Sequence, residues 1–159
     1  MKPVPSILVI CSANICRSPV VETLLRRRLG SDGHTQVKIS SAGTLGLDGA
    51  AAAEHSISLM AERGLDISGH RSRGVDLPML EAADLVLAME NGHVNLIKGA
   101  RPSLAPRIRR LAEMAGEERD VPDPYGGPRQ GYEEMVRDVE DLIERGMPSI
   151  LRALDLGAI

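Results

Sequence analysis

"SILVICSANICRSP", Ser6 to Pro19, is the stretch that decides the fold class, because a strand, a short loop and a helix start follow one another in it. Its first six residues form a continuous apolar run, which is typical of a parallel strand buried on both faces. Ser18 and Pro19 are residue types favoured at the N-cap and at the first position of a helix. The stretch also contains both cysteines of the chain, Cys11 and Cys16.

The rest of the chain continues this alternation. Apolar runs predict strands at residues 37–43, 83–89 and 107–114, and 3.6-residue periods predict helices at 18–30, 49–64, 90–98 and 132–154, the last interrupted or kinked at Pro148. Alternating strands and helices predict right-handed βαβ crossovers, and hence an α/β protein with three layers, α/β/α, around a four-stranded parallel sheet. No linker, repeat or low-complexity tract divides residues 1–159, so we expect one domain of Rossmann-like architecture.

The composition suits a folded protein with an aliphatic interior. Hydrophobic residues make up 43% of the 159 residues but aromatic residues only 1%, namely Tyr125 and Tyr132. A substrate pocket therefore has almost no aromatic wall to draw on. The net charge of −3 gives no indication of a nucleic-acid partner.

No apolar run approaches the length of a membrane span, so we expect no membrane contact. The first ten residues, "MKPVPSILVI", are too short and too rich in proline for a signal peptide. Two cysteines without a secretory signal favour a reducing compartment, in which both remain free thiols. We therefore expect a cytoplasmic protein, and the sequence indicates no oligomeric state.

The loop from Cys11 to Ser18 carries the residue types of an anion site. Ligands of parallel sheets bind at the carboxyl ends of strands, and helix N-termini attract anions. The N–H groups of the loop can converge on one oxyanion, and Arg17 adds a planar fork for two phosphate oxygens. These surroundings favour a thiolate at Cys11. The expected phosphate-binding residues are Ser12, Ala13, Asn14, Ile15, Cys16, Arg17 and Ser18.

Other kinds of anion or metal site find little support. Neither the G-x-x-x-x-G-K-[ST] nucleotide loop nor a G-x-G-x-x-G turn is present. Two cysteines and four scattered histidines offer no recognised ligand spacing, so we expect no metal and no cofactor. Cys16 has two open interpretations: it packs in the interior, or it traps Cys11 as a reversible disulfide under oxidation.

A second motif, "VPDPYGG" at 121–127, places Asp123 between two prolines in a loop rich in glycine. Asp and Pro are common in surface turns, so taken alone this is an ordinary turn. Phosphoryl transfer from an alkoxide or phenoxide leaving group, however, needs a proton donor on the far side from the nucleophile. Asp123 on a stiffened loop meets that requirement.

The two motifs together resemble those of the low-molecular-weight protein tyrosine phosphatases. "CSANICRSP" at 11–19 is similar to the family pattern C-x-G-N-x-C-R-S, and "DPYG" at 123–126 is similar to its D-P motif. "SSAGT" at 40–44 and "ERGLDISGHRSR" at 62–73 also look like family segments, so the resemblance covers most of the chain. It implies the phosphotyrosine phosphatase I-like fold and metal-free hydrolysis of protein phosphotyrosine and aryl phosphates.

The resemblance also implies catalytic roles for three residues. Cys11 would be the nucleophile that forms a phosphocysteine intermediate. Arg17 would bind the phosphoryl group and its transition state. Asp123 would be the general acid to the leaving group and then the general base for the attacking water.

Four further residues would support the loop by resemblance. Asn14 would hold its unusual backbone, and Ser18 would donate a hydrogen bond to the thiolate. Ser41 and His70 match family positions that brace the loop. For His70, an ordinary surface or packing role is the alternative.

Three positions depart from the family pattern. Ala13 replaces the usual glycine, at a cost on the order of 1 kcal/mol if that position needs φ > 0 and at none otherwise. Leu47 stands where a bulky aromatic often follows "SAGT", and Tyr125 is followed by Gly126 instead of a second aromatic. The pocket wall would be Ile15, Leu47 and Tyr125, which predicts weaker or broader selectivity for aryl phosphates.

Two other functions stay open. Protein-arginine phosphatases, a related branch of the family, tend to carry Thr where this chain has Ile15, whose apolar side chain favours a phenyl ring. A non-catalytic module that binds an oxyanion or a phosphoprotein could use the same loop, although Cys11, Arg17 and Asp123 together argue against it. The implied partner is a phosphotyrosine-containing protein. Bacterial relatives often oppose tyrosine kinases that control polysaccharide export, which makes such a kinase a candidate.

Overall fold

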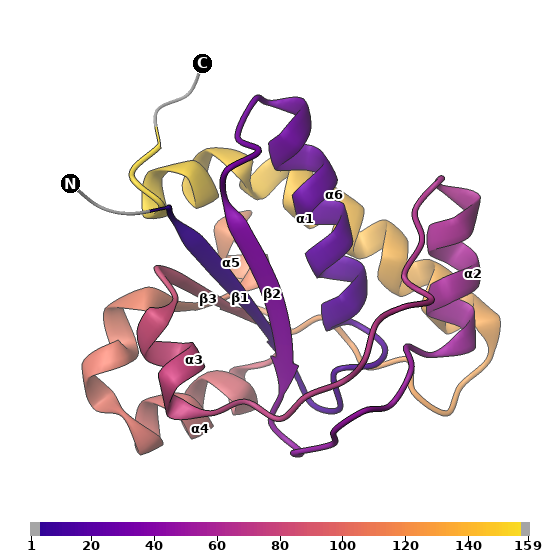
Figure 1. Ribbon diagram of the computed structural model, residues 1–159, viewed down its shortest axis with the longest axis horizontal. Helices are drawn as coiled ribbons and strands as arrows, with labels where there is room; N and C mark the ends of the chain where they lie inside the picture. Colours follow the sequence, from indigo (N-terminus) through magenta and orange to yellow (C-terminus); the bar gives the residue numbers. More distant parts are fainter. Residues whose placement is uncertain (1–3, 157–159) are drawn as a thin grey trace.

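The computed structural model describes residues 4–156, and a parallel sheet lies at its centre (Figure 1). The strands are β1 (Ser6–Cys11), β2 (Lys38–Gly43), β3 (Leu85–Ala88) and β4 (Ile108–Arg110), in the order β2-β1-β3-β4. All pairings are parallel, and β1 lies inside the sheet, with Val9 opposite both Ser41 and Leu87. The four-stranded parallel sheet predicted from the sequence is confirmed.

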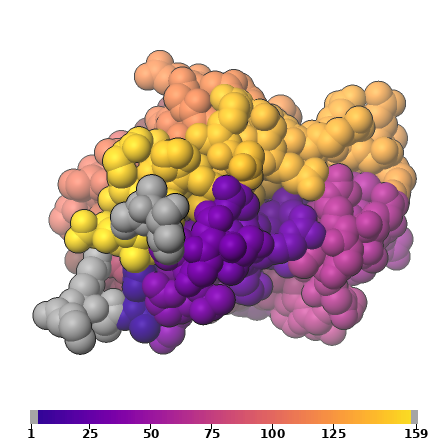
Figure 2. Space-filling view, turned by 90° about the horizontal axis from the view of Figure 1, so that it is seen from above, coloured from indigo at the N-terminus to yellow at the C-terminus, as the bar shows by residue number. Residues whose placement is uncertain are grey.

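Helices cover both faces of the sheet, which gives the three expected layers. Side chains alternate along β1, so that Ile7 and Val9 belong to one hydrophobic cluster and Leu8 and Ile10 to the other. The first cluster includes residues of α1 (Ser18–Ser31), α2 (Glu54–Glu62), α5 (Leu111–Met114) and α6 (Arg129–Ala153); the second includes residues of α3 (Leu77–Ala82), α4 (Asn91–Ala100) and the 3-10 helix η1 (Pro102–Arg107). Figure 2 shows α6, orange to yellow, lying along α1 in purple and reaching α2 in magenta.

The apolar pattern predicts a single strand at 107–114, but the structure has two elements there. The strand ends at Arg110, and α5 follows directly. The backbone N–H of Arg110 donates to the Glu113 carboxylate at 2.8 Å, which is a capping contact that starts a helix. Because a short apolar run fits a strand and a buried helix equally well, the cap decides between them.

Other differences concern element lengths. α3 and η1 are absent from the prediction, since six residues are too few to show a period. The helix expected at 49–64 spans only Glu54–Glu62. α6 begins earlier than predicted, at Arg129, and continues through Pro148 without interruption. The buried side chains of Met147 and Ile150 hold that part of α6 on the core, which offsets the hydrogen bond that a proline cannot donate.

Candidate active site

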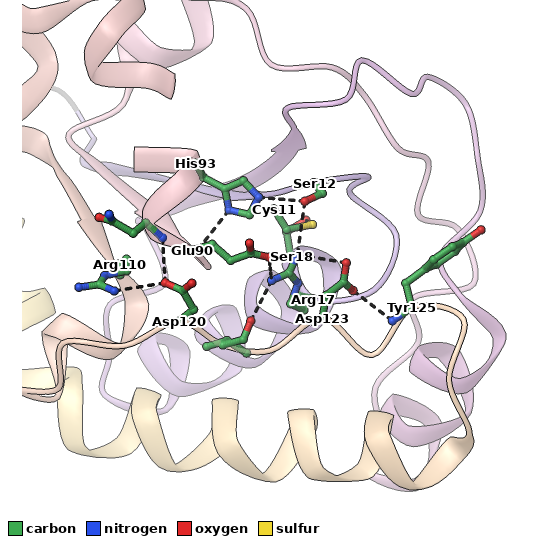
Figure 3. A network of polar contacts seen from close by, with 12 residues as sticks. Cys11, Ser12, Arg17, Ser18, Glu90, His93, Arg110, Asp120, Asp123 and Tyr125 are labelled. Carbon is green, nitrogen blue, oxygen red and sulfur yellow. Dashed lines mark hydrogen bonds and ion pairs between the residues drawn. The ribbon is translucent and has the colours of Figure 1, made fainter. Parts of the chain in front are cut away.

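Cys11 ends β1 at the carboxyl edge of the sheet, and residues 12–17 lead from it into α1. Its side chain is buried, and two donors reach its sulfur; Figure 3 shows Cys11 beside one of them, Ser18. The backbone N–H of Asn14 lies 3.2 Å from Sγ, and the hydroxyl of Ser18 lies 3.0 Å from it. Because the Ser18 oxygen already accepts a hydrogen bond from the Asn14 side chain, its own proton is available to the sulfur. Both contacts can stabilise negative charge on the sulfur during a reaction.

Arg17, the last residue of the loop, is almost fully buried. Its Nη1 donates to the carboxylate of Glu90 and to the carbonyl of Val121, which fixes the plane of the guanidinium. Its Nε is buried without a hydrogen-bond partner among the described residues. Within residues 4–156, the backbone N–H groups of 12–17 other than that of Asn14 also donate to no protein acceptor. A bound oxyanion would satisfy donors of this kind.

Asn14 holds the loop in shape. Its φ of 61° lies in the left-handed region, which asparagine adopts more readily than most residues. Its side-chain amide donates to Ser18 and Ser41, and its Oδ1 accepts from the N–H of Arg73. Nε2 of His70 donates to its carbonyl oxygen at 2.7 Å. Every polar group of Asn14 thus has a partner, and Ser41 and His70 both contact it.

Ala13, which departs from the family pattern, needs no special backbone conformation. Among the described residues other than glycine, only Asn14 and Asp155 have a positive φ. Ala13 therefore carries no left-handed strain, and the neutral one of the two outcomes applies.

Gly43, at the end of β2, lets the loop pass close to the neighbouring strand. A Cβ at this position would lie 2.5 Å from the carbonyl oxygen of Ser12 and 3.0 Å from backbone atoms of Ala13 and Asn14. We expect Gly43→Ala to displace the loop, to lower the free energy of unfolding by about 1–3 kcal/mol and to weaken phosphate binding. Denaturant unfolding and a phosphate titration measure both effects.

Gly30→Ala in α1 is the matched control for this prediction. A Cβ at Gly30 would have no heavy atom within 4 Å, and alanine suits a helix better than glycine by roughly 0.5–1 kcal/mol. The control should therefore be at least as stable as the wild type. Equal stability of the two variants would contradict the prediction for Gly43.

Asp123 lies close to Arg17, although the two motifs are far apart in the chain. Its Oδ2 is 3.5 Å from Nη2 of Arg17, and its Oδ1 accepts from the backbone N–H of Tyr125 at 3.1 Å. The carboxyl side chain is 40% exposed, so a proton can pass between it and a bound group or water. The structure thus brings the two sequence motifs into one site.

A cavity of about 450 Å³ opens at the loop, with an apolar rim. Its lining includes the three expected wall residues, Ile15, Leu47 and Tyr125, and also Leu45, to which no motif pointed. Leu45 is 71% exposed and Tyr125 is 68% exposed, and the ring of Tyr125 points away from the loop (Figure 3). The rim is therefore mostly aliphatic and open.

Cys16 is a free, buried thiol, as is Cys11. Its Sγ lies 3.5 Å from the hydroxyl of Tyr132 on α6. Burial raises the pKa of Cys16, and the hydrogen bond with Tyr132 offsets this only in part. Cys16 is therefore a neutral thiol near neutral pH, and a neutral thiol is a weak nucleophile.

The described part of the chain offers neither a membrane span nor a metal-binding cluster. Within residues 4–156, no helix combines the length and the hydrophobicity that a membrane span requires. In the same residues, no three or more side chains of His, Cys, Asp or Glu come together as a metal ion would need.

Glu90 and His93, next to and in the first turn of α4, join the site although no motif marks them. Glu90 forms an ion pair with Arg17, and Nε2 of His93 lies 3.0 Å from the Ser12 hydroxyl (Figure 3). The sequence contained one signal for Glu90, namely that it closely follows the buried strand β3. The carboxyl ends of parallel strands lie at the same edge of the sheet, which is where Cys11 lies.

His93 makes stability depend on pH. It is 5% exposed, and burial lowers its pKa below the ordinary value of 6.5, although the carboxylates of Glu90, Asp120 and Asp123 oppose this shift. The unfolded chain therefore binds a proton near pH 6.5 that the folded chain binds only at lower pH, so acid favours unfolding. We expect the free energy of unfolding of the wild type to fall below pH 6.5 relative to that of His93→Gln, which does not titrate. Denaturant unfolding across this range measures both proteins, and parallel curves would contradict the expectation.

The fold is that of an α/β protein whose cysteine- and arginine-containing loop lies at the carboxyl edge of a parallel sheet, and known proteins share this fold. The model of the low molecular weight phosphotyrosine protein phosphatase family matches residues 6–155. The probable low molecular weight protein-tyrosine-phosphatase EpsP of Ralstonia nicotianae is 34% identical over 151 residues, which are 95% of this chain and 99% of that protein. The chain belongs to the low molecular weight phosphotyrosine protein phosphatase family.

Two further similarities show the range of the family. The crystal structure of a low molecular weight protein tyrosine phosphatase from T. tengcongensis matches with a TM-score of 0.85 at 32% identity, covering 91% of this chain and 99% of that one. The protein-arginine-phosphatase of Geobacillus stearothermophilus is 31% identical over 140 residues, which are 87% of this chain and 91% of that protein.

Proposed function

We propose that the chain is a metal-free phosphatase that hydrolyses protein phosphotyrosine and aryl phosphates through a phosphocysteine intermediate on Cys11. The observation that carries the proposal is that Cys11, Arg17 and Asp123 line one cavity. Family membership supports it, since relatives of this chain are named protein-tyrosine-phosphatases.

The first step transfers the phosphoryl group to sulfur. The Cys11 thiolate attacks phosphorus, so that an S–P bond forms while the ester P–O bond breaks. Asp123, protonated, gives its proton to the departing oxygen. The fork of Arg17 and the free N–H groups of the loop hold the non-bridging oxygens and stabilise their charge in the transition state.

The second step hydrolyses the intermediate. The Asp123 carboxylate takes a proton from a water molecule, which attacks phosphorus and forms a P–O bond. The S–P bond breaks, and inorganic phosphate and the thiolate are released. Ser18 and the N–H of Asn14 favour this step because they stabilise the departing sulfur.

The rim favours phosphotyrosine over phosphoarginine. Ile15 and Leu47 have no side-chain acceptor for the N–H groups of a guanidinium, whose burial against them would cost free energy. A phenyl ring gains apolar contact at the same place. Arginine phosphatase activity is the second candidate, and the relative of that name at 31% identity supports it.

The partner that follows from this activity is a phosphotyrosine-containing protein in the cytoplasm. A tyrosine kinase that controls polysaccharide export is the candidate suggested by the family resemblance. Mass spectrometry of proteins captured by a substrate-trapping variant, Asp123→Ala, identifies such a partner.

One experiment tests the proposed function. Turnover of phosphotyrosine, phosphoarginine and phosphoserine peptides is compared side by side, with EDTA present. We expect phosphotyrosine to be hydrolysed fastest and EDTA to have no effect. Faster turnover of phosphoarginine would make phosphoarginine the substrate. Absence of turnover for every peptide would instead support a non-catalytic module that binds an oxyanion.

The missing aromatic in the rim predicts a gain of function. We expect Leu47→Trp to raise kcat/KM for a phosphotyrosine peptide by about 2–10-fold, because a ring pair contributes roughly 0.5–1.5 kcal/mol. Phosphoserine turnover should not change. Leu96→Trp is the control, since Leu96 is also exposed but lies on α4 outside the lining of the cavity. A similar gain in the control would count against stacking in the pocket.

A further inference from the structure

A hydrogen bond joins the first turn of α4 to the phosphate-binding loop. Nε2 of His93 lies 3.0 Å from the hydroxyl oxygen of Ser12, the residue that follows Cys11. The proposed two-step reaction uses neither of these two side chains. Ser12 nevertheless lines the same cavity as Cys11 and Asp123, so its hydroxyl lies within the site (Figure 3).

The contacts of His93 determine where its ring carries a proton. Its Nδ1 lies 3.2 Å from the backbone nitrogen of Glu90, whose N–H is a donor. Nδ1 must therefore accept, and the proton of the neutral ring is on Nε2. His93 consequently donates to Ser12. The Glu90 side chain in turn accepts from the backbone N–H of His93, which completes a capping box and holds the ring in place.

The direction of this bond frees the proton of Ser12. The Ser12 oxygen accepts from His93, and Nη2 of Arg17 approaches it at 3.5 Å as a second donor. Among the described residues, the hydroxyl of Ser12 contacts no group that could accept from it. A serine hydroxyl whose oxygen accepts two hydrogen bonds can still donate one through its own O–H group. A ligand bound in the cavity could accept a hydrogen bond from this O–H group.

We infer that the Ser12 hydroxyl is an additional hydrogen-bond donor to the phosphoryl group, one that acts mainly in the transition state, and that His93 is the positioning residue that orients it. The inference rests on the proposed phosphatase function. It adds a side-chain donor to the backbone donors of the loop. It also gives a role to the histidine in the first turn of α4, whose ring contacts the loop.

The expected transition-state role of the Ser12 hydroxyl is electrostatic. The non-bridging oxygens of a transferring phosphoryl group are stabilised most by donors whose positions are fixed before the reaction. A hydroxyl that is already oriented needs no reorganisation when the reaction occurs. The effect should therefore appear in kcat more than in KM.

The test is a double-mutant cycle on p-nitrophenyl phosphate hydrolysis. We expect Ser12→Ala to lower kcat by about 10–100-fold, the range for loss of one hydrogen bond to a charged group, with little change in KM. His93→Leu should lower kcat by a similar factor on its own, but by a factor near one in the Ser12→Ala background. His93→Gln should restore most of the activity, because its side-chain amide supplies both a donor and an acceptor.

Anion binding provides a readout that does not depend on turnover. Vanadate resembles the five-coordinate transition state, whereas inorganic phosphate resembles the product. We expect Ser12→Ala to weaken vanadate binding by about 10-fold or more and phosphate binding by much less. A merely structural role would weaken both equally, and equal weakening would overturn the inference.

The outcomes separate the inference from the proposed function. Wild-type kcat in Ser12→Ala, or independent losses in the two single variants, would overturn the inference while leaving the phosphatase intact. If the wild type showed no turnover that depends on Cys11, the proposed function would fail, and the vanadate measurement would still decide whether Ser12 is a donor. Thermal unfolding of each variant excludes loss of the fold as the cause of any decrease.

Discussion

Cys11→Ser is expected to reduce hydrolysis of p-nitrophenyl phosphate by at least roughly 10⁴-fold, because loss of a catalytic nucleophile removes the covalent pathway. The serine hydroxyl is far less acidic than a thiol, and the two donors at this position stabilise an anion that the hydroxyl does not form. Arg17 and the free N–H groups of the loop remain in place, so phosphate binding should persist. Turnover assays and a calorimetric phosphate titration measure the two properties separately.

Cys16→Ser is the matched control, because it makes the same change of sulfur to oxygen five positions along the loop. Cys16 contacts Tyr132 on α6, and burial raises the pKa of its thiol. We expect this control to retain readily measurable turnover. Activity that survives in Cys11→Ser, or that disappears equally in both variants, would refute the thiolate mechanism.

Asp123→Asn is expected to lower kcat by about 10²–10⁴-fold for phenyl phosphate, whose leaving group needs a proton. The loss should be much smaller for p-nitrophenyl phosphate, since p-nitrophenoxide leaves without protonation. Asp123 is 40% exposed, so its replacement should hardly change the free energy of unfolding. A series of aryl phosphates with graded leaving-group acidity measures this dependence.

Asp120→Asn provides the comparison for Asp123. Asp120 is another partly exposed carboxylate on the same segment, but it accepts from the N–H of Asn91 and from Arg110 and does not line the cavity. The control should keep the leaving-group dependence of the wild type. An equal loss for every leaving group in Asp123→Asn would show that the residue is not the proton donor.

The sheet and the loop could be predicted because their signals are local. The apolar run at 6–11, the helix start at Ser18 and the cysteine–arginine spacing all lie within one short stretch. The segment 107–114 could not, since its apolar pattern fits two structures and a side-chain cap decides between them. Short helices were missed for the related reason that they show no full period.

The site was predictable only where a motif marks it. Asp123 could be paired with Arg17 through the family resemblance, and the structure places them 3.5 Å apart. Glu90 and His93 also reach the loop, but each comes from a segment whose pattern is that of an ordinary strand end or helix. Their roles depend on which segments the fold brings together, and one sequence does not contain that information.

The contacts of Asn14 have a consequence for the speed and the cost of ligand capture. The residue ties the loop to α1 through Ser18, to β2 through Ser41, and to the segment 70–73 through His70 and Arg73. The loop is thus already ordered before an anion arrives, and its conformational entropy is lost during folding rather than during binding. A small dianion, which offers few contacts, can then bind without having to organise its own receptor.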